Sequence, residues 1–94
     1  MAQRPKITVY GNEYCSYCLA ARLLLKKKGL EFEDVLVTSD PSLRDEMERL
    51  SGSTSVPQVF IDGVSIGGFD ELYVMDQKGE LDRLTARCAT AASD

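Results

Sequence analysis

The fold is decided by residues 7–29, which read ITVYGNEYCSYCLAARLLLKKKG. The β-branched and aromatic run at 7–10 is typical of a short strand, and the Gly-Asn pair after it ends that strand. From Ser16 onward the leucines and alanines recur at spacings of one, three and four, which predicts an amphipathic helix ending at Gly29. The stretch is therefore a strand, a loop and a helix.

Cys15 and Cys18 lie where this loop meets the helix. A spacing of three residues on the first turn places both sulfurs on one face, where unpaired backbone N–H groups favour negative charge. A thiolate is favoured at such a position. Because Cys15 is nearer the exposed end of the turn, we expect it to be the nucleophile and Cys18, one turn inward, to be the resolving thiol.

A Cys-x-x-Cys pair has two other common uses, zinc binding and a structural disulfide. Structural zinc takes four ligands, and this chain has three cysteines and no histidine. A disulfide across so small a loop gives little entropic stabilisation, and cytosolic thiols are usually reduced. Reversible thiol–disulfide chemistry is the favoured interpretation.

The length of 94 residues and the hydrophobic content of 44% fit a single domain, residues 1–94. The net charge is −4 and the basic residues are only loosely clustered, so we expect no nucleic-acid partner. The one basic run, Lys26 to Lys28, is interpreted as cations in the last turn of the helix. Since no apolar stretch approaches the roughly 20 residues of a membrane span, and three cysteines do not suit a secreted disulfide scaffold, we expect a cytoplasmic protein without a membrane partner.

The downstream pattern continues the alternation of strand and helix. Residues 32–37 are predicted to form a second strand. Asp40 as N-cap and Pro41 at the first helical position predict a second helix that runs to about Leu50. Two such units in succession favour parallel strands joined by a right-handed crossover.

The second half of the chain begins with a hairpin signal. Two apolar runs, 59–61 and 64–66, flank the Asp-Gly pair at 62–63. Residues 69–78 and 81–89 are then predicted to form one interrupted helix or two short ones. The sequence thus predicts an α/β fold with a four-stranded mixed β-sheet flanked by helices, in the order βαβαββα.

Residues 55–57, Ser-Val-Pro, are predicted to begin the third strand. Proline lacks an N–H and is normally excluded from a central strand. A cis Val56–Pro57 bond would turn the backbone sharply and leave the N–H and C=O of Val56 free to pair with an extended peptide. A trans proline at the start of a strand is the alternative, and the sequence leaves the isomer open.

Four parts of the chain together resemble the glutaredoxin family, in its small bacterial dithiol form. They are Tyr10, Cys-Ser-Tyr-Cys at 15–18, Ser-Val-Pro-Gln-Val-Phe-Ile at 55–61, and Gly-Gly-Phe-Asp at 67–70. Their combined spacing, within residues 6–86, is more specific than Cys-x-x-Cys alone. The resemblance implies a thioredoxin-like fold and a glutathione-dependent thiol–disulfide oxidoreductase that reduces protein disulfides and glutathione mixed disulfides.

The resemblance also implies where glutathione binds. Its cysteinyl backbone would lie against Val56, and its γ-glutamyl end would meet Phe69 and Asp70. A helix N-terminus near Phe69 offers N–H groups to the α-carboxylate, and the Asp70 carboxylate can pair with the α-ammonium. Alternatively, Asp70 only favours the helix dipole, and Tyr17 is only a half-exposed helix residue. The implied glutathione-binding residues are Tyr17, Val56, Pro57, Gln58, Gly68, Phe69 and Asp70.

Ser16 departs from the family pattern, because dithiol members usually have proline there. Some members without this proline hold a [2Fe–2S] cluster between two protomers. In that arrangement Cys15 of each chain and the thiols of two glutathiones supply four thiolates. The alternative function is therefore a cluster carrier or sensor, a monomer as apo-protein and a cluster-bridged dimer when loaded, in which Cys15 is the metal ligand.

Asn12 is the second departure, since many relatives carry a lysine there. If nothing replaces that cation, we expect Cys15 to be less acidic and glutathione to bind less tightly, by about 1 kcal/mol for a partly exposed charge pair. Arg22 and Lys26 are candidate replacements. The third cysteine, Cys88, is expected to pack as a small hydrophobe or to lie idle on the surface, with a regulatory or intermolecular disulfide as the alternative.

Overall fold

The computed structural model describes residues 5–84. The elements follow one another in the predicted order, βαβαββα. They are β1 (Ile7–Gly11), α1 (Ser16–Lys27), β2 (Glu33–Leu36), α2 (Pro41–Ser51), β3 (Gln58–Ile61), β4 (Val64–Gly67) and α3 (Phe69–Gln77). A further helical segment occupies residues 80–84, after a break at Gly79, whose φ is +79°. Cys88 lies outside the described residues.

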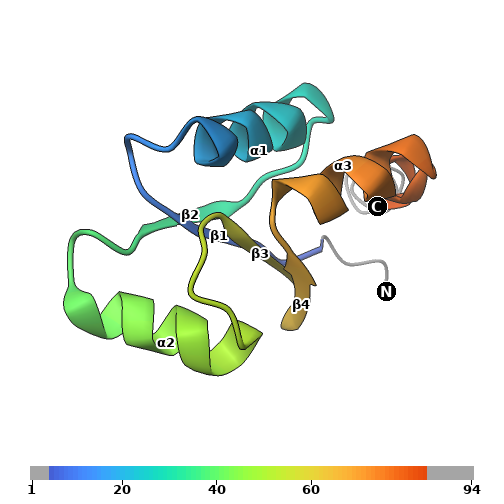
Figure 1. The fold of residues 1–94 in the computed structure, drawn as a ribbon. Coiled ribbons are helices and arrows are strands. Elements are labelled where there is room, and N and C mark those ends of the chain that lie inside the picture. Colours follow the sequence, from blue (N-terminus) through green and yellow to red (C-terminus); the bar gives the residue numbers. More distant parts are fainter. Residues whose placement is uncertain (1–4, 85–94) are drawn as a thin grey trace.

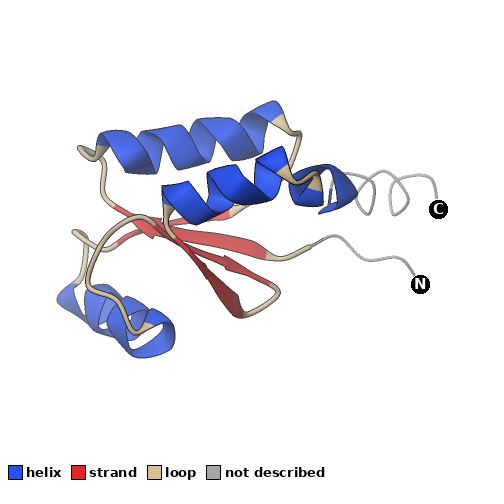
Figure 2. Cartoon of the chain, turned by 45° about the vertical axis from the view of Figure 1, so that its right-hand side comes forward, coloured by secondary structure: helices blue, strands red, loops and turns tan. Residues whose placement is uncertain are grey.

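The four strands form one mixed sheet in the order β2-β1-β3-β4. β1 is parallel to β2 and antiparallel to β3, and β4 is antiparallel to β3. Helices α1 and α3 cover one face of the sheet and α2 covers the other, as Figures 1 and 2 show. The predicted four-stranded mixed sheet is confirmed.

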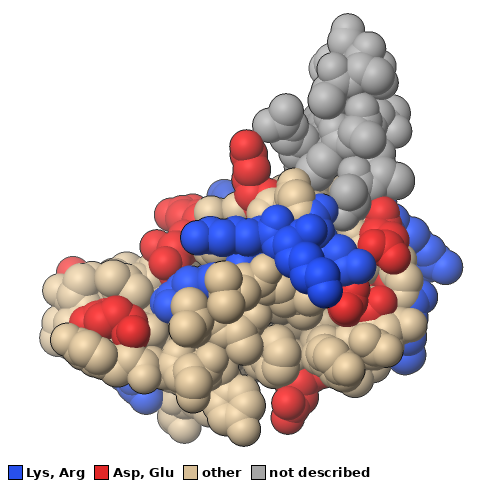
Figure 3. All heavy atoms as spheres, turned by 90° about the horizontal axis from the view of Figure 1, so that it is seen from above, with Lys and Arg blue, Asp and Glu red and all other residues tan. Residues whose placement is uncertain are grey.

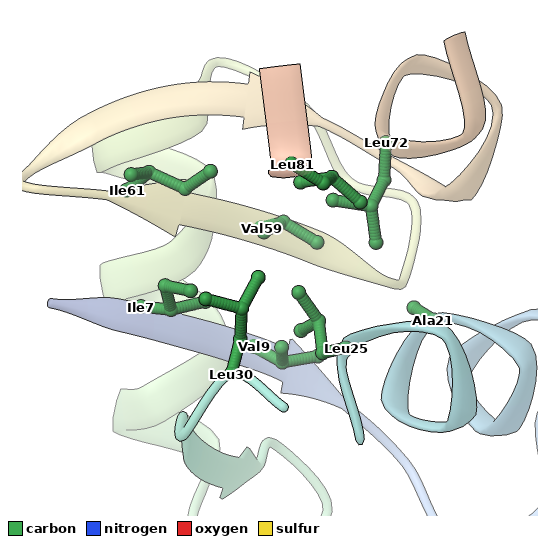
Figure 4. Close-up of a cluster of buried hydrophobic side chains, with 9 residues drawn as sticks. All are labelled: Ile7, Val9, Ala21, Leu25, Leu30, Val59, Ile61, Leu72 and Leu81. Carbon is green, nitrogen blue, oxygen red and sulfur yellow. The ribbon is translucent and has the colours of Figure 1, made fainter. Parts of the chain in front are cut away.

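The larger hydrophobic core lies between the sheet and the helices α1 and α3 (Figure 4). Alternate residues of the two central strands point into it, and leucines of the helices fill it. Its buried members are Ile7, Val9, Ala21, Leu25, Leu30, Val59, Ile61, Leu72 and Leu81. Burying one such side chain contributes about 1.5–3 kcal/mol, so this layer holds α1 firmly against β1.

A smaller core lies on the opposite face, under α2. Met47 of α2 is fully buried there with Tyr10, Val37 and Phe60. The rings of Tyr10 and Phe60 meet edge to face, with centroids 5.4 Å apart. The two cores fix both faces of the central strands β1 and β3.

Helix α1 ends at Lys27 with Lys28 as its C-cap, and Gly29 occupies the predicted C′ position with a φ of +73°. The N–H of Gly29 donates to the carbonyl of Lys26 and the N–H of Leu30 to the carbonyl of Leu25, each at 3.0 Å. This pair of bonds is a Schellman motif. Basic residues Lys26 and Lys27 occupy the last turn, and Figure 3 shows basic side chains gathered on the face that carries α1 and α3.

The start of α2 is also as predicted. Asp40 is the N-cap, its carboxylate accepts the N–H of Ser42 at 2.9 Å, and Pro41 opens the helix. The Asp62–Gly63 pair forms the hairpin turn with φ values of +52° and +82°. No helix within the described part of the chain has the length and apolar character needed to cross a bilayer.

The prediction for the start of the third strand was wrong. β3 begins at Gln58, and residues 55–57 belong to the preceding loop. Side chains satisfy this loop's polar groups: the hydroxyls of Ser53 and Ser55 lie 3.0 Å apart, and the N–H of Ser55 donates to Ser53 Oγ at 3.3 Å. Pro57 therefore precedes the ladder, and its peptide bond with Val56 is cis.

Candidate active site

Cys15 is the N-cap of α1, with φ −85° and ψ 122°. Its sulfur accepts the N–H of Cys18 at 3.4 Å, in the manner of a capping side chain. On the other side its thiol approaches the carbonyl of Val56, with 3.9 Å between sulfur and oxygen. The loop before β3 therefore lies directly against the sulfur of Cys15, which is partly exposed.

The surroundings of Cys15 stabilise its thiolate. Burial raises the pKa of this thiol, but hydrogen bonds from the N–H and thiol of Cys18 and from the N–H of Tyr17 outweigh it. The positive charge of Arg22 acts in the same direction as these bonds, and the net result is a lowered pKa.

Cys18 is completely buried, and its properties are the opposite. The pKa of its thiol is raised to about 11, because burial and the neighbouring Cys15 sulfur together outweigh the N–H of Asn12 and the charge of Arg22, which lower it. The two thiols are therefore sharply unequal. Cys15 is accessible and acidic, whereas Cys18 is hidden and holds its proton.

Arg22 is the cation that the structure brings to this pair. Its Nε lies 3.0 Å from Oδ1 of Asp34 on β2, and its Nη2 donates to the carbonyl of Asn12 at 3.2 Å. Its side chain is only 12% exposed. The Asn12 side chain is occupied in shaping the loop, because its Oδ1 accepts the N–H of Tyr14 at 3.0 Å. Lys26 is exposed, one turn further along α1.

A groove with a volume of about 440 Å³ begins beside Cys15. It brings together all seven residues that the sequence assigned to a glutathione site. The lining residues are Tyr17, Ser51, Ser53, Ser55, Val56, Pro57, Gln58, Ser65, Ile66, Gly67, Gly68, Phe69, Asp70 and Glu71. The serines were missed by the sequence analysis, although the Ser-rich run 51–55 marks this loop. Cys15 is not among the lining residues and lies at the edge of the groove, against Val56.

The N-terminus of α3 forms part of the groove wall. Gly68 is the N-cap and supplies no side-chain bond to the first turn of the helix. A Cβ at Gly68 would lie 3.2 Å from the carbonyl oxygen of Pro57, so this position holds two backbone segments close together. The first turn also carries two acids, Asp70 and Glu71, and Asp70 is exposed.

Tyr17 and Gln58, two further residues of the predicted glutathione site, differ in exposure. Tyr17 is 62% exposed, and its ring centroid lies 6.3 Å from that of Phe69 across the mouth of the groove. Gln58 is 4% exposed, and its Nε2 donates to the carbonyl of Ser55 at 2.9 Å and to Ser55 Oγ at 3.2 Å. Gln58 thus fixes the loop that forms the groove wall.

Few of the described side chains near Cys15 could bind a metal ion. Among residues 5–84, there is no group of three or more His, Cys, Asp or Glu side chains that could hold a metal ion. Cys15 is the accessible thiol of the motif, and Cys18 is buried. One chain thus offers a single accessible thiolate here, so a cluster with four thiolate ligands fits only if a second chain and external thiols complete the set.

The fold and the paired thiols define a thioredoxin-like protein with a dithiol at the start of its first helix. The glutaredoxin family model matches residues 7–66. Glutaredoxin 3 of Escherichia coli K12 is 44% identical over 78 residues, which cover 83% of this chain and 94% of that protein. The chain belongs to the glutaredoxin family, whose members are generally oxidoreductases.

Solved structures agree with this assignment. The solution structure of glutaredoxin from Brucella melitensis is 40% identical, with a TM-score of 0.74, over 85% of this chain and 87% of that one. The holo form of glutaredoxin C1 from Populus tremula x tremuloides is 30% identical, with a TM-score of 0.79, over 94% and 82% of the two chains. The predicted thioredoxin-like fold is confirmed.

Proposed function

We propose that the protein is a glutathione-dependent thiol–disulfide oxidoreductase that acts on glutathionylated and disulfide-containing proteins in the cytoplasm. The observation that carries the proposal is the accessible, acidic Cys15 at the edge of a groove. The Cys15 thiolate attacks the glutathione sulfur of a mixed disulfide. A Cys15–glutathione disulfide forms, the bond to the substrate sulfur breaks, and the substrate leaves as a thiolate that takes up a proton.

The Cys15–glutathione disulfide is resolved by a second thiol. Free glutathione can attack the bound glutathione sulfur, which forms glutathione disulfide and releases the Cys15 thiolate. Alternatively, Cys18 attacks Cys15 and releases glutathione. Cys18 is completely buried, and burial disfavours its thiolate, so the route through glutathione should predominate.

The groove supplies chemically suited partners for the cysteinyl and γ-glutamyl parts of glutathione. Val56 precedes β3, so its N–H and C=O lie outside the β1–β3 ladder and are suited to the cysteinyl backbone. The uncapped first turn of α3 at Phe69 is suited to the α-carboxylate, and Asp70 to the α-ammonium. Tyr17 would cover the bound peptide, while Gly68, Pro57 and Gln58 shape the walls. These assignments remain part of the proposal.

Serine substitutions test the proposed chemistry. Reduction of a glutathionylated peptide by glutathione is measured for wild type, Cys15→Ser and Cys18→Ser. We expect Cys15→Ser to be inactive and Cys18→Ser to retain most of the activity, because the glutathione route needs only one protein thiol. Equal activity of Cys15→Ser and wild type would refute the assignment of the nucleophile.

The binding of glutathione is tested at Asp70. Loss of a partly exposed charge pair costs up to about 1 kcal/mol, so Asp70→Asn should raise KM for the glutathionylated peptide about fivefold and leave kcat nearly unchanged. Asp45→Asn on α2 is the matched control, since Asp45 is also exposed and is not among the residues that line the groove. Equal KM values for the two variants would exclude Asp70 from the site.

The asymmetry of the thiols also favours a second function, a cluster carrier or sensor. Cys15 of two chains and two glutathione thiols would hold a [2Fe–2S] cluster, which supplies electron-transfer chemistry when bound. Anaerobic reconstitution with iron, sulfide and glutathione should give a coloured dimer for wild type and for Cys18→Ser, and not for Cys15→Ser. A colourless, monomeric wild-type product would overturn this second function.

A further inference from the structure

The guanidinium of Arg22 and the sulfur of Cys18 meet at Gly11. A Cβ on Gly11 would lie 2.7 Å from Cys18 Sγ and 3.3 Å from Arg22 Nη2, so both groups lie over this one backbone position. The peptide of Asn12 connects them further: its N–H donates to the sulfur of Cys18, and its carbonyl accepts from Arg22 Nη2 at 3.2 Å. The guanidinium of Arg22 therefore lies close to the thiol of Cys18.

The charge of Arg22 is balanced by Asp34. Their ion pair measures 3.0 Å, and the Asp34 side chain is 40% exposed while that of Arg22 is 12% exposed. Lys26 and Glu31 line the surface hollow outside this pair. In the loop between β1 and α1, the carboxylate of Glu13 accepts a hydrogen bond from the hydroxyl of Thr38 at 3.0 Å. Among the described residues, the charges that face Cys18 are therefore Arg22, with Asp34 behind it, and the Cys15 thiolate.

We propose that Arg22 is a positioning residue for the resolving step: its positive charge, partly offset by the paired carboxylate of Asp34, controls how readily the buried Cys18 thiol becomes a nucleophile. The inference rests on the proposed function in one respect, the resolving role of Cys18. In the Cys15–glutathione disulfide the Cys15 thiolate is gone, and Arg22 is then the charged group left against Cys18. It stabilises the thiolate that attacks Cys15 and expels glutathione.

The test uses an aromatic disulfide, 5,5′-dithiobis(2-nitrobenzoate), so that no glutathione site is needed. The Cys15 thiolate attacks it and releases one coloured thionitrobenzoate anion. The Cys18 thiolate then attacks Cys15, forms the Cys15–Cys18 disulfide and releases a second anion. Stopped-flow absorbance follows the two releases as separate phases. All proteins carry Cys88→Ser, so that the two cysteines of the motif are the reacting thiols.

Two substitutions in the same ion pair should act in opposite directions. Arg22→Gln removes a charge that lowers the pKa of Cys18, so a smaller fraction of Cys18 is thiolate and the second phase should slow about threefold. Asp34→Asn keeps an oxygen for Arg22 Nε and removes the opposing charge, so the second phase should speed up about twofold. Arg22→Lys, which keeps the charge, should restore most of the rate.

Lys26→Gln is the matched control, because it makes the same charge change one turn away and should leave the second phase unaltered. The pH profile of the second phase should move to higher pH in Arg22→Gln and to lower pH in Asp34→Asn. If both variants change the second phase in the same direction, or neither does, the inference is overturned. If wild type releases only one anion per chain, Cys18 does not resolve the Cys15 disulfide, and this overturns both that part of the proposed function and the inference about Arg22.

Discussion

Gly11→Ala tests the packing that holds the two thiols in place. Gly11 ends β1, and an added Cβ would lie 2.7 Å from Cys18 Sγ and 3.2 Å from Cys18 Cβ. Contacts shorter than about 3.4 Å between such atoms are repulsive, and Cys18 cannot withdraw because α1 is packed against the core through Leu25. Since overpacking of this kind costs about 1–3 kcal/mol, we expect a loss of about 2 kcal/mol in the free energy of unfolding.

A double-mutant cycle separates this clash from other effects. Cys18→Ala removes the sulfur that Gly11→Ala would strike, so the two substitutions together should cost about 1 kcal/mol less than the sum of the single ones. Urea unfolding of the four reduced proteins gives the free energies. If Gly11→Ala unfolds at the wild-type urea midpoint, or if the two effects simply add, the close approach of Cys18 to β1 is refuted.

Three further predictions concern stability. Between pH 9 and pH 11 the unfolded chain releases the Cys18 proton, whereas the folded chain keeps it because its pKa is raised to about 11. The free energy of unfolding, measured with urea, should therefore fall over this range by about 2 kcal/mol more in reduced wild type than in Cys18→Ala. The hydrogen bond from the N–H of Ser42 lowers the pKa of Asp40, so Asp40→Ala should be less stable than wild type at pH 7. As the pH falls below about 4, Asp40 takes up a proton and this contribution is lost, so the urea midpoint of wild type should approach that of Asp40→Ala. Met47→Ala should lower the free energy of unfolding in urea by about 2–5 kcal/mol, because Met47 is fully buried. Leu50→Ala, on the same helix, should lower it far less because Leu50 is 47% exposed. Equal losses in the two variants would argue against the packing of α2 on the sheet through Met47.

Much of the fold follows from local signals in the sequence. The end of α1 at Gly29, the cap and first residue of α2, and the Asp-Gly hairpin were predicted because each depends on a few neighbouring residues with restricted backbone preferences. The start of β3 was placed three residues too early. Its boundary depends on which backbone groups find partners in β1, and serine side chains satisfy the residues before Gln58 instead.

The sequence predicts those parts of the candidate site that depend on one short motif. It does not predict contacts between segments that are distant in the sequence. The position of Cys15 at a helix N-terminus follows from the spacing of the motif. The role of Arg22 does not, because its contacts with Asn12 and Asp34 depend on the packing of α1 against β2. Gln58 was expected to line the groove, and the direction of its amide toward Ser55 is set by the folded loop.

In the proposed reaction Cys15 takes glutathione from a mixed disulfide. The most direct measurement is the mass of the adduct that Cys18→Ser forms with one equivalent of a glutathionylated peptide, followed by peptide mapping. We predict that each chain gains one glutathione on Cys15 and that the peptide is released as a free thiol. Peptide attached to Cys15, or glutathione found on another residue, would contradict the account.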